Sequence, residues 1–206
     1  MSEPEWLVMG RELRAIAQIG LTFAKDPFDR QRYTRIRELA ASLMARSSGA
    51  HEASILDLFL RDAGYATPKV DVRGAAFRDG RILLVREVSD GRWTVPGGWT
   101  DVNQTAADCV VREIAEESGF AANAVKLAAV HDYHKRNAGP HLDSIYKMFF
   151  ICELTGGEAR TSDETSEVAF FARDRLPPLS LGRSTAEQIE LMFRHAERPD
   201  LPTDFD

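Results

Sequence analysis

The chain has 206 residues, of which 44% are hydrophobic and 28% charged, proportions typical of a globular protein with a sizeable core. Its 26 Lys and Arg face 32 Asp and Glu, and the formal charge of −6 argues against a protein that grips duplex nucleic acid. The N-terminus, MSEPEWLVMG, is acidic where a signal peptide would be basic, and no apolar run approaches the roughly 20 residues of a membrane span. We therefore expect a cytoplasmic protein.

The first 66 residues carry a helical pattern. Apolar residues recur at spacings of three and four from Trp6 onward, a second helix is expected after an N-cap at Asp29, and a third ends at Gly64. Over residues 1–66 nine Lys and Arg balance nine Asp and Glu. This balance favours a basic helix face paired with acids at a dimer interface over a nucleic-acid site. We predict a small helical domain over residues 1–66 that packs on the rest of the chain or on a second copy.

From Pro68 the period changes to that of strands. VDVRGAAF alternates, RILLVRE is a short apolar run, and Asp79-Gly80 between them is a hairpin signal. Further strand-like runs are WTVP, VKLAAVHDYH, YKMFFICEL and EVAFF. A last helix is expected near STAE, where Ser184 and Glu187 have the capping-box spacing, and the tail RPDLPTDFD reads as loosely structured. Mixed strands with few helices indicate an α+β fold or an α/β/α sandwich.

The two cysteines, Cys109 and Cys152, belong to no ligand or redox spacing. One lies in a helical pattern and the other in a strand pattern. Both are predicted to be small residues of the core.

One short predicted helix carries three glutamates. In the stretch REIAEES, Glu113, Glu116 and Glu117 lie within about 100° of one another, opposite an apolar stripe. Gly119 ends the helix, and the preceding PGG gives a tight loop whose carbonyls can approach a ligand. A solvated helix face is the alternative, but such a face would interleave Lys, and the only cation between residues 106 and 120 is Arg112. We interpret the cluster as a site for Mg²⁺ or Mn²⁺.

These residues resemble the motif of the Nudix hydrolase superfamily, a Gly followed by spaced Glu and then REUxEExGU, where U is bulky and apolar. Gly98 and the run from Arg112 to Phe120 match it. The motif usually has a Glu six residues after its first Gly, and here Gln104 stands there. Because that Glu usually has a structural role near the loop, the difference bears on loop geometry more than on catalysis.

The resemblance extends over nearly the whole chain, to the subfamily with an N-terminal helical domain that includes bacterial CDP-choline and ADP-ribose pyrophosphatases. It implies an α+β fold, a Nudix α/β/α sandwich with a mixed sheet over residues 67–206 after the helical domain of residues 1–66. It also implies divalent-metal-dependent cleavage of a nucleoside diphosphate linked to another moiety, and a homodimer.

Carried over by position, the family's metal ligands are Glu113, Glu116, Glu117 and the carbonyl of Gly97, and Arg112 orients the acids. A loop acid of the family, used as a ligand or base, corresponds to Glu164. Its competitor is Glu167, and a solvated loop carboxylate is the alternative for either.

Other polar residues are weaker candidates. Tyr133 and Lys135 are predicted to border a substrate pocket, with an ordinary exposed strand end as the default. Arg86 could reach a phosphate, although a surface arginine is the favoured interpretation. His131 and His134 have a spacing that invites zinc, but no third ligand lies at zinc-site spacing.

A different class of function also fits. The extra helices and Gln104 are consistent with a ligand-sensing or regulatory module that uses the same fold without turnover. The acid cluster favours the enzyme, because a pure binding module has no need of so costly a group of carboxylates. The leading hypothesis is a pyrophosphohydrolase that binds a small nucleoside diphosphate derivative, with Mg²⁺ or Mn²⁺ as cofactor.

Overall fold

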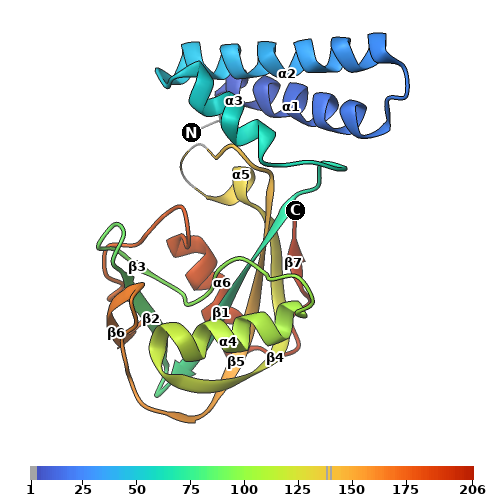
Figure 1. Cartoon of the computed structure of the whole chain (residues 1–206). Helices are drawn as coiled ribbons and strands as arrows, with labels where there is room; N and C mark the ends of the chain where they lie inside the picture. The colour runs from blue at the N-terminus through green and yellow to red at the C-terminus, as the bar shows by residue number, and fades with distance from the viewer. Residues whose placement is uncertain (1–3, 138, 140) are drawn as a thin grey trace. The chain divides into compact units, whose positions relative to one another are not determined.

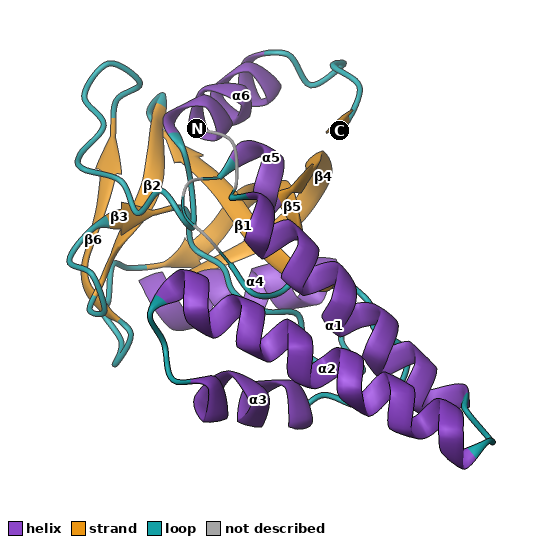
Figure 2. Cartoon of the chain, turned by 90° about the horizontal axis from the view of Figure 1, so that it is seen from above, coloured by secondary structure: helices purple, strands orange, loops and turns teal. Residues whose placement is uncertain are grey.

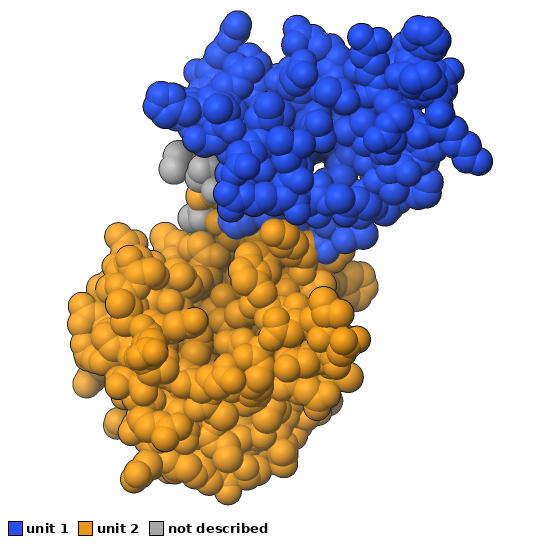
Figure 3. Space-filling model, viewed as in Figure 1, with its two compact units in different colours: residues 1–68, 140–144 blue, residues 69–139, 145–206 orange. Residues whose placement is uncertain are grey.

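The computed structural model describes residues 4–137, 139 and 141–206. The chain divides into two compact units, one made of residues 1–68 and 140–144 and the other of residues 69–139 and 145–206 (Figure 3). Each unit has its own hydrophobic core.

Among the described residues, the first unit is helical and the second contains the strands (Figure 1). The helices of the first unit are α1 (Glu5–Phe23), α2 (Pro27–Ser48) and α3 (Glu52–Leu60). The strands of the second unit are β1 (Lys69–Arg78), β2 (Arg81–Glu87), β3 (Trp93–Thr94), β4 (Phe120–Asp132), β5 (Ile145–Gly157), β6 (Thr165–Phe171) and β7 (Asp204–Phe205). Its helices are α4 (Ala106–Ser118), α5 (Tyr133–Arg136) and α6 (Ala186–Glu197).

Two glycines of α1 allow α2 to pack closely against it. A β-carbon at Gly10 would fall 2.6 Å from the end of the Met44 side chain, and one at Gly20 would fall 2.4 Å from the ring of Tyr33. The core of this unit consists of apolar residues from all three helices: Leu7, Ala40, Ala41, Met44, Ala45, Ile55 and Phe59.

The N-cap of α2 is Asp26, whose side chain accepts from the Phe28 amide at 2.6 Å. The predicted cap at Asp29 was wrong because Pro27 starts the helix earlier, as proline does at a first helical position.

The second unit is built on a mixed seven-stranded sheet. The strand order is β3-β2-β1-β5-β4-β7, with β6 paired to β2. The β1–β5 and β4–β7 pairs are parallel and the others are antiparallel. The predicted α+β fold with a mixed sheet is confirmed.

One helix covers each face of this sheet (Figure 2). On one face, Val110 and Ile114 of α4 pack on even-numbered residues of β1 such as Val72. On the other, Ile189 and Met192 of α6 pack on odd-numbered residues of β1, because successive side chains of a strand point to opposite faces. This arrangement is the α/β/α sandwich expected from the sequence.

Three details of the second unit differ from the predictions. Helix α6 is capped by Thr185 with a capping box to Gln188, one residue later than the predicted Ser184 and Glu187. The Ser184 hydroxyl lies instead 2.9 Å from the Thr94 hydroxyl in the core, which explains why it does not cap the helix. The tail forms β7 beside β4, and the last part of the predicted strand VKLAAVHDYH forms α5.

Cys109 and Cys152 are both free and buried, as predicted. In the described part of the chain, no helix has the length and apolar character needed to cross a membrane.

Candidate active site

Helix α4 has well-defined ends. The Thr105 side chain accepts from the Asp108 amide at 3.1 Å, and Gly119 adopts a left-handed conformation with φ 78° directly after the last helical residue. A β-carbon at Gly119 would fall 2.5 Å from the Glu158 carbonyl, so glycine is needed there for space as well as for conformation. The buried Val110 and Ile114 fix the rotation of the helix, which determines where its acids lie.

The loop before α4 lies directly against β1. Gly97 has φ 143°, and a β-carbon there would fall 1.9 Å from the Val72 carbonyl oxygen, so only glycine fits. The Val72 amide donates to the Gly98 carbonyl at 2.8 Å. The Gly74 amide donates to the Pro96 carbonyl, also at 2.8 Å. Among the described residues, none donates to the Gly97 carbonyl between them, so this oxygen has not used its capacity to accept a hydrogen bond or bind a cation.

Glu117 joins α4 to this loop. The Gly97 amide donates to Glu117 Oε2 at 2.9 Å, and Glu117 is only 5% exposed. The Thr165 hydroxyl donates to the Glu117 carbonyl at 2.7 Å, which ties β6 to the same turn of the helix. Burial raises the pKa of the Glu117 carboxyl to about 8, although Arg73 and the Gly97 amide oppose the increase. A carboxylate this deeply buried favours a cation beside it.

Glu113 faces the second glycine of the loop. A β-carbon at Gly98 would fall 3.2 Å from Glu113 Oε2, so the absent side chain leaves room around this carboxylate. Arg112 Nη2 lies 2.9 Å from Glu113 Oε1. Burial raises the pKa of Glu113, and Arg112 opposes the increase. The structure therefore brings two carboxylates, one helical turn apart, against two consecutive glycines.

Arg112 organises the exposed side of the cluster. It donates to Glu116 Oε2 at 2.6 Å and to Asp101 Oδ2 at 3.1 Å. Its Nε donates to Gln104 Oε1 at 3.3 Å. An amide oxygen accepts a hydrogen bond as a carboxylate does, so Gln104 keeps this contact without the negative charge. Glu116 is turned toward Arg112, and its side chain is 58% exposed.

The two candidate loop acids have different surroundings. Glu167 forms an ion pair with Arg86, and Arg86 Nε also donates to the Gly91 carbonyl at 2.8 Å. Glu164 is exposed and forms no ion pair with the described residues. A role for Glu164 as a base and a role for Arg86 on a phosphate both stay predictions, and the second requires that Arg86 release these contacts.

The predicted substrate-side residues lie on the single turn α5. Tyr133 is buried and Lys135 is exposed. His131 Nε2 lies 2.7 Å from Asp204 Oδ1 on β7, so this histidine helps to hold the C-terminal strand in place. The assignment of Tyr133 and Lys135 to a substrate pocket stays a prediction.

Sequence reasoning missed a buried ionic cluster at the start of β1. Asp71, Arg73 and Lys147 are each 5% exposed or less. Arg73 pairs with both Asp71 oxygens at 2.9 and 2.7 Å, and Lys147 Nζ donates to Asp71 Oδ1 at 2.9 Å. The available signal was the alternation of VDVR, which places Asp71 and Arg73 on one face of the strand.

A second missed acid is Glu87, at the end of β2. It is 7% exposed, and Arg183 Nε lies 3.0 Å from its Oε1. Burial raises the pKa of Glu87, and the nearby Arg183 and Arg73 oppose the increase. Both Glu87 and Arg73 influence the pKa of Glu117, so all three belong to one electrostatic environment.

Comparison with known families identifies the chain. Residues 68–192 match the NUDIX domain, and residues 4–59 match a family described as a UDP-X-like, N-terminal oligomerisation domain. The chain belongs to the Nudix hydrolase family. Helix α4 with its preceding loop is therefore the Nudix helix and loop, as the sequence motif predicted.

Two of the similar proteins extend over all or nearly all of this chain, and a third covers about two thirds of it. The Bacillus subtilis protein YjhB, whose assignment as an ADP-ribose pyrophosphatase is provisional, is 45% identical over 99% of this chain and 98% of its own length. A crystal structure of an ADP-ribose pyrophosphatase from Streptococcus suis is 44% identical, with a TM-score of 0.63, over 68% of this chain and 100% of that chain. A crystal structure of a UDP-X diphosphatase is 33% identical, with a TM-score of 0.64, over 100% of both chains.

The donors of the Nudix helix and loop fit a hard divalent cation. Glu113 and Glu117 offer carboxylate oxygens, and Gly97 offers a carbonyl without a hydrogen bond from any described residue. Within the described ranges, no three His, Cys, Asp or Glu side chains converge enough to hold a metal by themselves, and Glu116 is paired with Arg112. The fit is therefore to an ion that takes further oxygen ligands from water or phosphate, as Mg²⁺ does.

Proposed function

We propose that this Nudix hydrolase is a divalent-metal-dependent pyrophosphohydrolase that cleaves a nucleoside diphosphate linked to another moiety. The observation that carries the proposal is the placement of Glu113 and Glu117 against Gly98 and Gly97. Two buried or half-buried carboxylates beside a carbonyl without a partner among the described residues are suited to Mg²⁺ or Mn²⁺ bearing phosphate.

In this proposal Glu113, Glu116, Glu117 and the Gly97 carbonyl hold the cation, and Arg112 orients Glu113 and Glu116 through the contacts described above. When bound, the cation lowers the pKa of a water and neutralises charge on the phosphoryl oxygens. Glu116 is paired with Arg112, so joining the other ligands requires that it release this contact.

Glu164 is proposed as the base. Its exposed carboxylate is free to accept a proton from water as the new P–O bond forms. The phosphoanhydride bond then breaks, and the products are a nucleoside monophosphate and a phosphorylated remainder. Tyr133 and Lys135 are proposed to border the substrate, with Lys135 providing positive charge at the rim.

The substrate class is proposed from the relatives. Their names favour ADP-ribose or a uridine diphosphate derivative, and the similarity to each extends well beyond the Nudix helix. CDP-choline stays in the set of expected substrates because the N-terminal helical domain resembles that subfamily. A panel with one common assay for nucleoside monophosphate release decides among the three.

The test compares wild-type protein with Glu117→Gln, each with Mg²⁺ and with Mn²⁺, against ADP-ribose, UDP-sugars and CDP-choline. Metal-dependent release of a nucleoside monophosphate that is lost in the variant supports the proposal. A protein that binds ADP-ribose tightly without turnover, and whose affinity is unchanged by Glu117→Gln, is instead a nucleotide-sensing module, and the proposal is then wrong.

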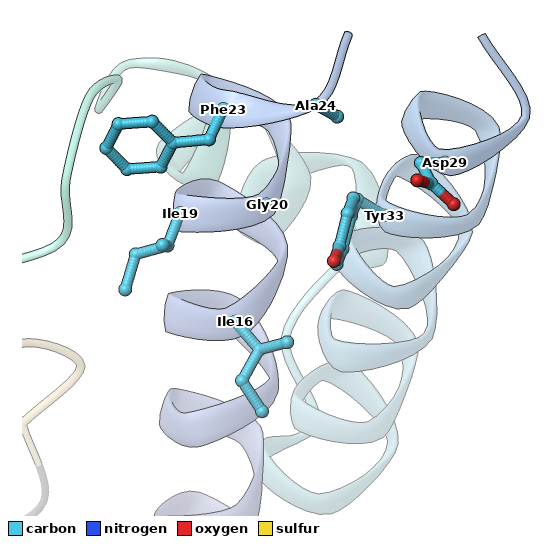
Figure 4. A pocket seen from close by; sticks show the side chains of 7 residues that line it. All are labelled: Ile16, Ile19, Gly20, Phe23, Ala24, Asp29 and Tyr33. Atoms are coloured by element: carbon cyan, nitrogen blue, oxygen red, sulfur yellow. The ribbon is translucent and has the colours of Figure 1, made fainter. Parts of the chain in front are cut away.

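We also propose that residues 1–66 form a dimerisation domain and that the enzyme is a cytoplasmic homodimer. The helical unit has a surface pocket of about 440 Å³ between α1 and α2 (Figure 4), lined by Ile16, Ile19, Gly20, Phe23, Ala24, Asp29 and Tyr33. Ile16 is 45% exposed, Phe23 is 64% exposed, and the nearby Phe28 is 67% exposed. Exposed apolar groups of this size around one hollow favour a protein partner, and the oligomerisation family matched by residues 4–59 favours a second copy.

A further inference from the structure

The Asp71, Arg73 and Lys147 cluster is unusual because it buries two positive charges with one negative charge. Asp71 and Lys147 are direct neighbours in the parallel pairing of β1 and β5, and Arg73 lies two residues along on the same face. All three side chains are nearly inaccessible to solvent. Replacing such a cluster with apolar residues is often neutral or stabilising, so stability alone does not account for it.

Arg73 extends the cluster to the Nudix loop. Its Nε and Nη2 are held by Asp71, and its Nη1 donates to the Val95 carbonyl at 3.3 Å. Val95 is fully buried and lies two residues before Gly97. The planar guanidinium is suited to this arrangement, because one side of its fork is fixed by a carboxylate while the other reaches the backbone.

Residues of β1 donate hydrogen bonds to the two backbone carbonyls before Gly97 and to the one after it. The Val95 carbonyl accepts from Arg73 and from the Thr94 hydroxyl, the Pro96 carbonyl from the Gly74 amide, and the Gly98 carbonyl from the Val72 amide. The Gly97 carbonyl is therefore the one backbone carbonyl oxygen of residues 95–98 without a donor among the described residues. The Gly97 amide is held by Glu117.

We propose that Arg73 is a positioning residue that fixes the Nudix loop so that the Gly97 carbonyl and Glu117 are presented together, and that Asp71 and Lys147 hold Arg73 in place. The inference rests on the proposed function, because the fixed loop conformation is proposed to serve cation binding. In this proposal Arg73 acts through its bond to the Val95 carbonyl, and its positive charge also lowers the pKa of Glu117.

The first test uses Arg73→Met, with Arg78→Met as the matched control. Loss of Arg73 leaves Asp71 paired with Lys147, a neutral pair, so the variant is expected to fold. Arg78 lies on the same strand, and its guanidinium lies 4.7 and 4.9 Å from the rings of Phe120 and Phe170 instead of contacting the loop.

Amide hydrogen exchange reports on the loop without any metal or substrate. In Arg73→Met we expect peptides covering residues 94–100 to exchange at least about tenfold faster than in the wild type, and no such change in Arg78→Met. Equal exchange in the two variants overturns the proposal, as does an increase spread evenly over the whole domain, which would indicate a general loss of stability.

Mn²⁺ binding, measured by electron paramagnetic resonance without substrate, is the second readout. Arg73→Met is expected to bind at least about tenfold more weakly, and kcat to fall by a similar factor while KM changes little. Arg73→Lys keeps the charge but lacks the fork, so we expect it to bind Mn²⁺ as weakly as Arg73→Met. If Arg73→Lys binds Mn²⁺ as tightly as the wild type, the proposal that Arg73 positions the loop is overturned.

The outcomes separate this inference from the proposed function. If the wild type binds no Mn²⁺ and hydrolyses nothing, the proposed function fails, and the claim that the loop serves a cation fails with it. The exchange comparison still decides whether Arg73 fixes the loop. If the wild type is active and Arg73→Met matches it in exchange, affinity and kcat, only the inference fails.

Discussion

The Gly97 amide donates a hydrogen bond to Glu117 Oε2 at 2.9 Å, across 20 residues of chain. This bond joins the Nudix loop to the last turn of the Nudix helix. It also explains why Glu117 is buried while Glu116, the residue before it, is exposed and paired with Arg112. Glu117 is therefore held against the Nudix loop, whereas Glu116 is held by Arg112.

Glu117→Gln is expected to lower kcat by about 100-fold or more, because the variant loses a charged ligand. The amide oxygen of glutamine can still accept from the Gly97 amide, so the melting temperature of the metal-free protein is expected to be unchanged or higher. Steady-state kinetics and thermal unfolding in the presence of a chelator measure the two effects.

Glu153→Gln, an exposed acid on β5, is the control for loss of one negative charge. A Glu117→Gln variant that retains wild-type kcat would contradict the ligand role of Glu117. A variant that is inactive only because it is unfolded would show a lowered melting temperature, and this would argue for a structural role.

Gln104 can be tested by restoring the residue that the Nudix motif usually has. Because Gln104 already accepts from Arg112 Nε, Gln104→Glu is expected to change kcat by no more than about threefold. Gln104→Ala removes the contact with Arg112. It is expected to lower kcat by more than Gln104→Glu changes it, since Arg112 also holds Glu113 and Glu116. A large gain of activity in Gln104→Glu would mean that the glutamine impairs the site.

The C-terminal end and the acids of the Nudix helix were predicted because they depend on local chain chemistry. Gly119 provides the left-handed residue at the end, and the apolar stripe fixes which side faces the sheet. Each of these signals lies within four residues of the position it determines. The predicted metal-ligand roles stay predictions.

The ionic cluster at β1 was not predictable in the same way. Asp71 meets Lys147 through a parallel strand pair that joins residues 76 apart in sequence. No periodicity of VDVR or YKMFF specifies which strand lies beside which. The C-terminal strand was missed for the same reason, since β7 is fixed by pairing with β4 and by contacts such as His131 with Asp204.

Lys147 gives the folded state a distinct pH dependence. Burial, and then the positive charge of Arg73, lower the pKa of Lys147 from 10.5 to about 8 despite the ion pair with Asp71. Between these two values the unfolded chain holds a proton that the folded chain has released. Raising the pH through this range therefore increases the contribution of Lys147 to the free energy of unfolding.

Lys147→Met removes this contribution. At about pH 7 we expect the variant to be as stable as the wild type or more stable, because Asp71 remains paired with Arg73. Toward about pH 10 the wild type should gain on the variant by up to about 1.4 kcal/mol for each pKa unit. Urea unfolding at both pH values measures the change, and Lys69→Met controls for loss of a lysine. If the difference in the free energy of unfolding between the wild type and Lys147→Met is the same at both pH values, the lowered pKa of Lys147 is contradicted.

The proposed dimer surface is tested by Ile16→Glu. Ile16 is 45% exposed at the edge of the pocket between α1 and α2, so a charge there should cost little in the monomer and much in a buried interface. We expect light scattering to detect a dimer for the wild type and a dissociation constant raised at least about tenfold in the variant. Leu60→Glu, an exposed apolar position on α3 that does not line this pocket, is expected to leave the dimer intact. If Ile16→Glu dimerises like the wild type, a different face of the protein joins the copies; if the wild type is monomeric, the exposed apolar side chains of α1 must serve another partner.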